Sequence, residues 1–398
     1  MSNSSHVNTG DAFSAADRAG DYVEEDTTVT TPTLPRRRAE TILDENPDSI
    51  DRETPAAPAS PIFPDSGDRP DTSALFINPA AGLAAASRTT NPAKASTGFR
   101  GVLARLGFPV APGPAEAAQQ HLTELRTIDE TTIRQATWIR AVSILVNNPK
   151  GGTGKTPIAL LLGGVLAAIR GGSVAILEVS DDPGALNFRA EGNPQLGLGE
   201  LVRDVTHIRT AGHIAGYTAP QTSFASVIGS TGRRERLTHT SVTAVANVID
   251  EFYAIRVMDS GNVTTSSAFQ GAVSVSDVLV IPVMNAGDSV LEAIQLLDEL
   301  RSAGGQSAHL ADTAIAIRLT DGRPENAAVR DEVERLLKNA GVSALHEIPY
   351  DAHIAERGPL TLSNLSPATR DAFTAAAASV VRSLQAVVST APSPTRKA

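Results

Sequence analysis

The feature that most limits what this chain can fold into is a glycine-rich loop between an apolar run and an apolar helix. The loop reads Asn147-Asn-Pro-Lys-Gly-Gly-Thr-Gly-Lys-Thr156 and follows a strand expected at 142–147. A strand, a glycine-rich turn and a helix N-terminus aim several backbone N–H groups and the positive end of the helix dipole at one point. The sequence therefore predicts a loop that binds a polyphosphate.

Residue types within this loop suit that task. Glycines let the backbone close around an anion without Cβ clashes. Lys155 is expected to bridge the β- and γ-phosphates, and the Thr156 hydroxyl is expected to bind Mg²⁺. The predicted nucleotide-binding set is Gly151, Gly152, Thr153, Gly154, Lys155, Thr156 and Pro157.

Apolar runs typical of strands alternate with segments of helical period after Trp138. Strands are expected at 142–147, 173–179, 254–259, 278–283, 313–318 and 344–348. Helices are expected at 155–170, 240–252, 289–303, 325–340 and 367–388. Strands that are apolar on both faces and separated by helices form a parallel sheet covered on both sides. The predicted fold class is α/β, a three-layer P-loop NTPase with a mostly parallel central sheet.

The N-terminal third differs in composition. Residues 1–137 hold 13 of the 25 prolines and carry 12 Lys and Arg against 19 Asp and Glu. Residues 1–114 are therefore expected to be a disordered arm rich in Pro, Ala and Thr, with a short docking helix at 98–108. Residues 115–140 are expected to be a helical linker with a break near Asp129, followed by a folded domain at 141–390 and a flexible tail at 391–398.

Composition also excludes several classes of protein. The chain has no cysteine, which rules out disulfide scaffolds, zinc–thiolate sites and cysteine-ligated iron–sulfur clusters. Its first 20 residues lack the apolar core of a signal peptide, and no window of 18 apolar residues occurs. A cytoplasmic protein is expected.

The spacing Lys150-Gly-Gly-x-Gly-Lys-Thr, with an additional lysine at its start, resembles the deviant Walker A motif of the ParA/MinD family of P-loop ATPases. The resemblance covers about residues 140–390. It implies a domain that binds ATP and Mg²⁺, forms an ATP-dependent homodimer and hydrolyses ATP slowly without a stimulating partner. It also implies that Lys155 contacts the nucleotide of its own subunit and that Lys150 reaches the nucleotide of the other.

A second segment, Ile176-Leu-Glu-Val-Ser-Asp-Asp-Pro-Gly-Ala185, ends a strand where this family carries the acids that orient the attacking water. The spacing aligns Glu178 with the first acid and Asp182 with the last. The resemblance implies that Asp182 positions the water, with Asp181 as its close competitor. An Asp-Asp-Pro-Gly turn capped by its own side chains is the alternative.

A third segment, Tyr253-Ala-Ile-Arg-Val-Met-Asp259, looks like the family's Walker B strand. The resemblance implies that Asp259 holds a water on Mg²⁺, so that Thr156 and Asp259 are the residues of the metal site. Residues 278–283 and 347–351 resemble late strands whose ends line the base pocket. Among the basic residues, Arg233-Arg-Glu-Arg236 is either a solvated face or a contact to non-specific DNA. The C-terminal helix lacks the basic face of a membrane-binding helix, so it is expected to pack on the sheet.

The resemblance implies an ATPase for partition or positioning of DNA or of a protein assembly, working with an activating adaptor protein. The Pro-rich N-terminus and residues 98–108 look like the actinobacterial MinD/ParA-like branch found near type VII secretion and mobile-element loci. Two alternatives stay open. One is an ATP-dependent ligase or synthetase of the dethiobiotin or cobyrinate type, and the other is a weakly hydrolysing scaffold, suggested by Pro157 and Glu178.

Overall fold

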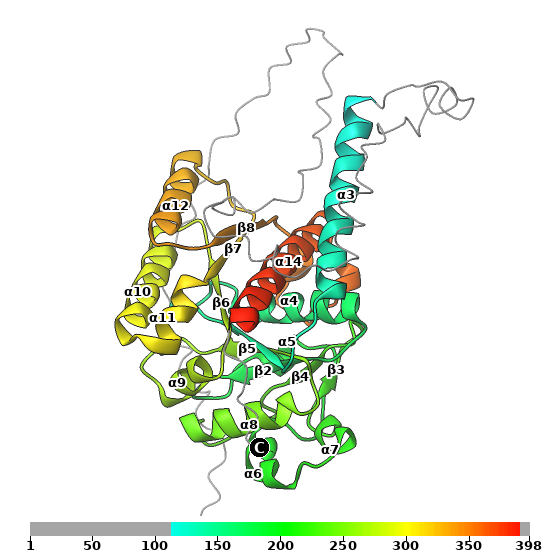
Figure 1. Ribbon diagram of the computed structural model, residues 1–398, viewed down its shortest axis with the longest axis vertical. Coiled ribbons are helices and arrows are strands. Elements are labelled where there is room, and N and C mark those ends of the chain that lie inside the picture. Colours follow the sequence, from blue (N-terminus) through cyan, green and yellow to red (C-terminus); the bar gives the residue numbers. More distant parts are fainter. Residues whose placement is uncertain (1–112, 391–398) are drawn as a thin grey trace, which may run out of the picture. The chain divides into compact units, whose positions relative to one another are not determined.

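The centre of the protein is an eight-stranded sheet (Figure 1). The computed structural model describes residues 113–390 of the chain. Its strands are β1 (Val142–Val146), β2 (Val174–Val179), β3 (Ala219–Pro220), β4 (Ser226–Ile228), β5 (Ile255–Ser260), β6 (Val278–Val283), β7 (Ile315–Leu319) and β8 (Ala344–Ile348). Their order in space is β3-β4-β2-β5-β1-β6-β7-β8. Every pair is parallel except β3 with β4, so seven strands end at one edge of the sheet.

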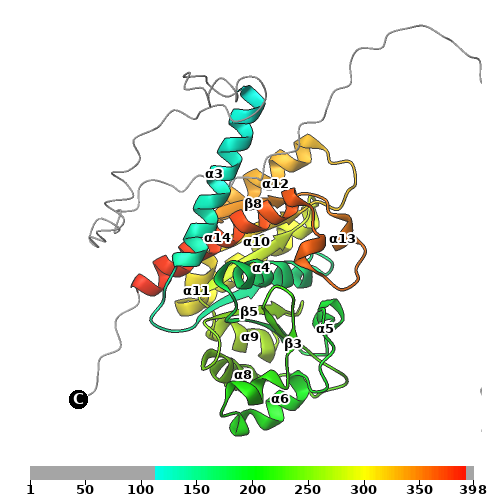
Figure 2. The ribbon, with the colours of Figure 1, turned by 90° about the vertical axis from the view of Figure 1, so that its right-hand side faces the viewer.

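Helices connect the strands and cover both faces of the sheet (Figures 1 and 2). They are α3 (Pro114–Gln135), α4 (Lys155–Arg170), α5 (Leu186–Arg189), α6 (Leu198–Asp204), α7 (Ala211–Ala215), α8 (His239–Asp250), α9 (Ser267–Ser274), α10 (Gly287–Ala303), α11 (Gly305–Asp312), α12 (Ala327–Asn339), α13 (Ala352–Ala355) and α14 (Pro367–Thr390). Two short 3₁₀ turns lie at Val205–His207 and Leu362–Asn364.

The core is split into two apolar layers by the sheet. Along β1, Val142, Ile144 and Val146 face one layer and Leu145 faces the other, because side chains alternate along a strand. The first layer lies under α3, α4 and α14, and the second lies under α6 to α12. This is the three-layer α/β fold that the sequence predicts.

All six predicted strands are present, with boundaries that differ by at most two residues. Strands β3 and β4 were not expected, nor were the short helices α5, α6, α7, α9, α11 and α13. The expected break near Asp129 is wrong, since α3 runs unbroken from Pro114 to Gln135. Tertiary contact accounts for this, because Arg382 of α14 donates to the Asp129 carboxylate at 2.7 Å.

Helix α3 lies against α14 and α4 (Figures 1 and 2). Ile133, near its C-terminal end, and Ala136, just beyond it, are buried in the first core layer. The guanidinium of Arg170 donates to the carbonyl oxygens of both residues, at 2.7 Å and 2.9 Å, and lies 4.8 Å above the Trp138 ring. The predicted disordered arm up to residue 112, its docking helix at 98–108 and the tail at 391–398 lie outside the described residues.

No helix within residues 113–390 combines the length and apolar character that crossing a bilayer requires. The same part of the chain brings no three His, Asp or Glu side chains together in a group that could hold a metal ion.

Candidate nucleotide-binding site

The glycine-rich loop joins β1 to α4 at the edge of the sheet where the parallel strands end. Gly154, the residue before α4, has φ +91°, a left-handed conformation that side chains other than glycine rarely adopt. A Cβ atom at Gly154 would also collide with the Leu319 side chain at the end of β7. For both reasons only glycine fits at this position. The N-terminus of α4 is therefore preceded by a residue without a side chain.

The Lys155 side chain lies inside the loop. Its Nζ donates to the carbonyl oxygens of Asn148 at 2.7 Å and Lys150 at 3.0 Å. Burial lowers the pKa of Lys155 to about 8, and the charge of Asp259 opposes this shift. The ammonium group is thus held at the floor of the loop by two carbonyl oxygens, within electrostatic reach of Asp259 in β5.

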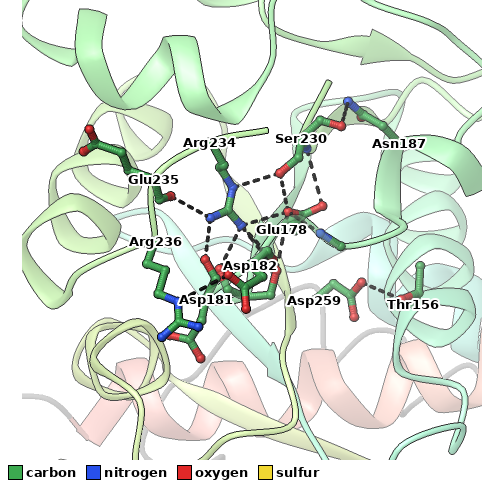
Figure 3. A network of polar contacts seen from close by, with 12 residues as sticks. Thr156, Glu178, Asp181, Asp182, Asn187, Ser230, Arg234, Glu235, Arg236 and Asp259 are labelled. Atoms are coloured by element: carbon green, nitrogen blue, oxygen red, sulfur yellow. Dashed lines mark hydrogen bonds and ion pairs between the residues drawn. The ribbon is translucent and has the colours of Figure 1, made fainter. Parts of the chain in front are cut away.

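Asp259 and Thr156 meet across the same floor, because β5 lies beside β1. The Thr156 hydroxyl donates to Asp259 Oδ2 at 2.7 Å (Figure 3). The second carboxylate oxygen, Oδ1, is buried without a hydrogen-bond partner. Burial raises the pKa of Asp259 to about 7, and the charge of Glu178 adds to the rise, whereas Thr156 and Lys155 oppose it. A buried carboxylate oxygen without a partner, beside a threonine hydroxyl, fits the oxygen ligands that Mg²⁺ prefers.

Lys150 takes a different direction. Its Nζ lies 2.8 Å from Oδ2 of Asp288 in the first turn of α10, and both side chains are about half exposed. The hydrogen bond to Asp288 raises the pKa of Lys150 and lowers that of Asp288. The side chain of the first lysine of the motif is therefore at the surface, paired with Asp288, and does not lie on the floor of the loop.

Two asparagines that were not predicted as site residues fix the loop to the sheet. Asn147 Nδ2 donates to Ser260 Oγ at 2.5 Å and to the Gly261 carbonyl at 2.9 Å. Asn148 Nδ2 donates to the carbonyls of Pro282, at 2.7 Å, and Ser289, at 3.1 Å. Both asparagines are fully buried. Paired amides directly after an apolar strand were the sequence signal that could have found them.

The acidic segment at the end of β2 has a buried acid, Glu178, and an exposed one, Asp182, each paired with an arginine (Figure 3). The Glu178 side chain is 2% exposed and forms an ion pair with Arg234 at 3.0 Å. Asp182 has a side chain that is 71% exposed, 3.3 Å from Nε of Arg236. Glu178, aligned with the first family acid, is thus engaged by an arginine, whereas Asp181 and Asp182 both lie in the wall of the pocket.

These segments surround one pocket of about 870 Å³. Its walls come from the phosphate loop, the ends of β2 and β5, the ends of β7 and β8, and α13. Of the predicted site residues, seven line it: Gly152, Gly154, Lys155, Thr156, Pro157, Asp182 and Asp259. Lys150, Gly151 and Thr153 do not, and the Thr153 hydroxyl instead donates to the Lys150 carbonyl at 3.3 Å.

The far end of the pocket matches the expectation that a late strand lines it. Pro349, Tyr350 and Asp351 follow β8 and form part of the wall, together with Leu319, the last residue of β7, and Thr320 after it. Arg189 and Arg357 also line this end and were not predicted as site residues. The pocket is therefore longer than the phosphate loop alone requires.

Known proteins resemble part of this chain. Two curated relatives, both the ESX-1 secretion-associated protein EspI of Mycobacterium tuberculosis, are 26% identical over 230 residues, which is 56% of this chain and 34% of the relative. The match thus spans about a third of the relatives' length.

Solved structures with similar folds include the ParA family ATPase of Chlorobium tepidum, with a TM-score of 0.47, 15% identity, and coverage of 62% of this chain and 96% of that one. Another is cobyrinic acid a,c-diamide synthase of Mycobacterium smegmatis with bound ADP and magnesium. Its TM-score is 0.43, its identity is 12%, and the match covers 61% of this chain and 94% of that one.

Residues 144–359, which run from β1 through the pocket to the segment after α13, match the family described as CbiA, the CobQ/CobB/MinD/ParA nucleotide binding domain. The match covers more than half of the chain and includes the ends of β1, β2 and β5, where the loop and the two acidic segments lie. The chain belongs to the CobQ/CobB/MinD/ParA family of nucleotide-binding domains.

Proposed function

We propose that this protein is a cytoplasmic Mg·ATP-binding ATPase that dimerises when ATP is bound and positions a protein assembly. The observation that carries the proposal is the arrangement of Thr156, Asp259 and Lys155 on the floor of one pocket. It places a buried ammonium group, a hydroxyl and a carboxylate oxygen without a partner at a helix N-terminus.

Each of these groups has a separate task. Lys155 neutralises phosphate charge, and the backbone N–H groups at the start of α4 donate hydrogen bonds to phosphate oxygens. Thr156 and Asp259 hold the magnesium ion, which supplies positive charge to the phosphates during transfer. Burial disfavours the charged form of the Asp259 carboxylate and so raises its pKa. A cation bound beside Asp259 would stabilise that charged form.

Asp182 or Asp181 holds the attacking water in this proposal. Both acids line the pocket, and both follow β2, which ends next to the strand that bears Asp259. Phosphoryl transfer depends almost wholly on positioning and charge placement. The exposure of Asp182 suits an acid that a second subunit or an adaptor protein brings into place, and turnover is then slow without that partner.

A protein cargo is favoured over DNA for two reasons. The curated relatives carry a secretion-associated name, and the densest basic cluster of the nucleotide-binding domain exposes only two of its three arginines, Arg233 and Arg236. Its central residue, Arg234, is buried in an ion pair. DNA binding without sequence preference depends on exposed cations that neutralise phosphates, and this chain has a net charge of −10.

The test is calorimetric titration of Mg·ATP into the wild-type protein and Lys155→Ala. Because Lys155 is the buried cation of the floor, the variant should lose at least about tenfold in affinity, or about 1.4 kcal/mol. Lys338→Ala in α12 is the matched control, since Lys338 is exposed and does not line the pocket. Equal affinities of wild type and Lys155→Ala would overturn the nucleotide assignment.

A further inference from the structure

The arginine at the centre of the run Arg233-Arg-Glu-Arg236 is buried, although its sequence context suggests a solvated face. The Arg234 side chain is 4% exposed, and its Nη2 lies 3.0 Å from Oε1 of Glu178, which is 2% exposed. Arg234 lies between β4 and α8, and Glu178 lies in β2, 56 residues earlier. Removing two opposite charges from water is costly, so such a pair persists only when its remaining hydrogen bonds are satisfied.

Arg234 satisfies them with the backbone of the acidic loop (Figure 3). Its guanidinium donates to the carbonyl oxygens of Ser180 at 2.8 Å, Asp181 at 2.7 Å and Asp182 at 3.2 Å. Its Nε donates to the Ser230 hydroxyl at 2.9 Å. One side chain therefore holds three consecutive peptide groups, and those peptides carry both candidate acids of the pocket.

Glu178 completes the arrangement from the opposite side. Its carboxylate accepts from the Ser230 hydroxyl at 2.5 Å and from the Gly184 backbone N–H at 3.0 Å. Gly184 is at the far end of the same loop. Arg234 thus holds the loop from Ser180 to Asp182, and Glu178 holds it at Gly184. The Asp182 side chain itself forms an exposed ion pair with Arg236 at 3.3 Å.

We propose that Arg234 is the positioning residue of the nucleotide site and that Glu178 is its counterion, not a ligand of the nucleotide or of Mg²⁺. Arg234 fixes the backbone of the Ser180–Gly184 loop, and this backbone aims Asp181 and Asp182 into the pocket. The role in catalysis rests on the proposed ATPase function. Arginine is needed because its planar fork presents five N–H donors in fixed directions, whereas a lysine ammonium cannot span three carbonyl groups and a carboxylate.

The experiment compares Arg234→Lys with wild type in three measurements: Mg·ATP affinity, steady-state phosphate release, and hydrogen exchange of the backbone amides at 181, 182 and 184. The variant should keep ATP affinity and KM within about twofold, because the phosphate loop is untouched. Its kcat should fall at least about tenfold, because small displacements of positioned groups are costly in rate. The three amides should exchange faster, whereas amides of β1 and α4 should not change.

Arg233→Lys is the matched control, since Arg233 is the exposed neighbour in the same run. Ser230→Ala, which removes one partner of both Arg234 and Glu178 without leaving a charge unpaired, is the second variant in case Arg234→Lys folds poorly. It should show the same pattern to a smaller degree. If the loop amides of both variants exchange at the wild-type rate, Arg234 does not hold the loop. If they exchange faster and kcat is unchanged, Arg234 holds the loop but does not position the catalytic acid.

The exchange measurement also separates this inference from the proposed function. If wild-type protein binds no ATP, the proposed function fails, yet the loop amides still report whether Arg234 holds the loop. If ATP is hydrolysed and kcat falls together with faster loop exchange, both stand.

Discussion

At the scale of single residues, Asp181 and Asp182 are the two candidates for the acid that holds the attacking water. Both line the pocket, and Arg234 holds the carbonyl groups of both. Asp182→Ala should keep ATP affinity and reduce phosphate release at least about tenfold, because the attacking water loses its acceptor. A phosphate-release assay measures this. If Asp181→Ala is impaired and Asp182→Ala is not, the water-positioning acid is Asp181, and if neither variant is impaired the segment is a turn only.

His346 is buried in the core and should make the stability of the fold depend on pH. Its Nε2 lies 2.9 Å from the Ser379 hydroxyl of α14, and burial lowers the pKa of His346 to about 4, with the charge of Arg382 acting in the same direction. The unfolded chain therefore binds a proton at this residue near pH 6.5, and the folded chain binds it only near pH 4. Stability from this residue is complete above about pH 6.5 and is lost as pH falls towards 4.

His346→Gln, which keeps a polar group near Ser379, removes this titration. Between about pH 7 and pH 4.5 the free energy of unfolding of the variant should fall by about 2 to 3 kcal/mol less than that of wild type. Denaturant unfolding at the two pH values provides the comparison. His121→Gln on the exposed side of α3 is the control. Equal losses in wild type and His346→Gln would show that His346 is not a buried neutral histidine.

The site residues that the sequence predicts are those with a local signal. Lys155 and Thr156 stand in a motif, and Asp259 ends an apolar strand, so their positions follow from the parallel sheet. Arg234 and Arg256 could not be predicted as buried, because burial of a cation depends on partners elsewhere in the fold. Arg256 pairs with the Asp250 carboxylate and donates to the Ala246 and Val275 carbonyls at 3.0 Å and 2.8 Å.

At the scale of elements, long helices and apolar strands could be predicted, whereas short ones could not. Helix α4 has the predicted bounds, because a glycine precedes it and Gly171 ends it in the left-handed conformation. Strand β4 has three residues and β3 has two, so neither shows an alternation of apolar and polar positions. Strand β4 joins the sheet by pairing with β2, and β3 pairs with β4 in turn.

Helix α3 leads to a prediction about truncation. A protein beginning near Ala115 should bind ATP and melt as the full chain does, since the predicted arm is not expected to belong to the ATPase domain. A protein beginning at Thr137 loses α3, which exposes the apolar surface that Ile133 covers and removes the carbonyl partners of Arg170.

Burial of a side chain such as that of Ile133 contributes about 1.5 to 3 kcal/mol to the free energy of unfolding. The deeper truncation should therefore lower the melting temperature by at least about 5 °C, as measured by circular dichroism. Loss of folding or of ATP binding in the shorter truncation would place the domain boundary before Ala115. An unchanged melting temperature in the deeper one would show that α3 is a separate linker.

At the scale of the whole molecule, one edge of the sheet collects every predicted chemical group. Parallel strands β1, β2 and β5 end side by side, so residues more than 100 positions apart, such as Thr156 and Asp259, meet within hydrogen-bonding distance. This follows from topology alone and explains why the fold class and the floor of the pocket were predictable. The far end depends on α13 and on loops that have no sequence motif, and it was predicted only in part.

At this scale we also expect the protein to dimerise when ATP is bound. Lys150 lies at the surface beside Asp288 of α10, so the loop and the start of α10 form one exposed area with paired charges. An exposed ion pair of this kind contributes little to stability and is easily exchanged for another partner. The phosphates of a nucleotide bound to a second subunit carry more negative charge than one carboxylate, so they should take Lys150 from Asp288 when two subunits meet.

Light scattering with a non-hydrolysable ATP analogue should therefore report a dimer for wild type and a monomer for Lys150→Ala, although the variant still binds the analogue through Lys155. Asp288→Asn is the informative control, because it releases Lys150 without removing it and should leave the dimer intact. A dimer that persists in Lys150→Ala would make Lys150 a solvated residue of its own loop. If wild type stays a monomer with the analogue bound, dimerisation is not part of the mechanism. The acid that positions the water would then have to be brought into place within a single subunit.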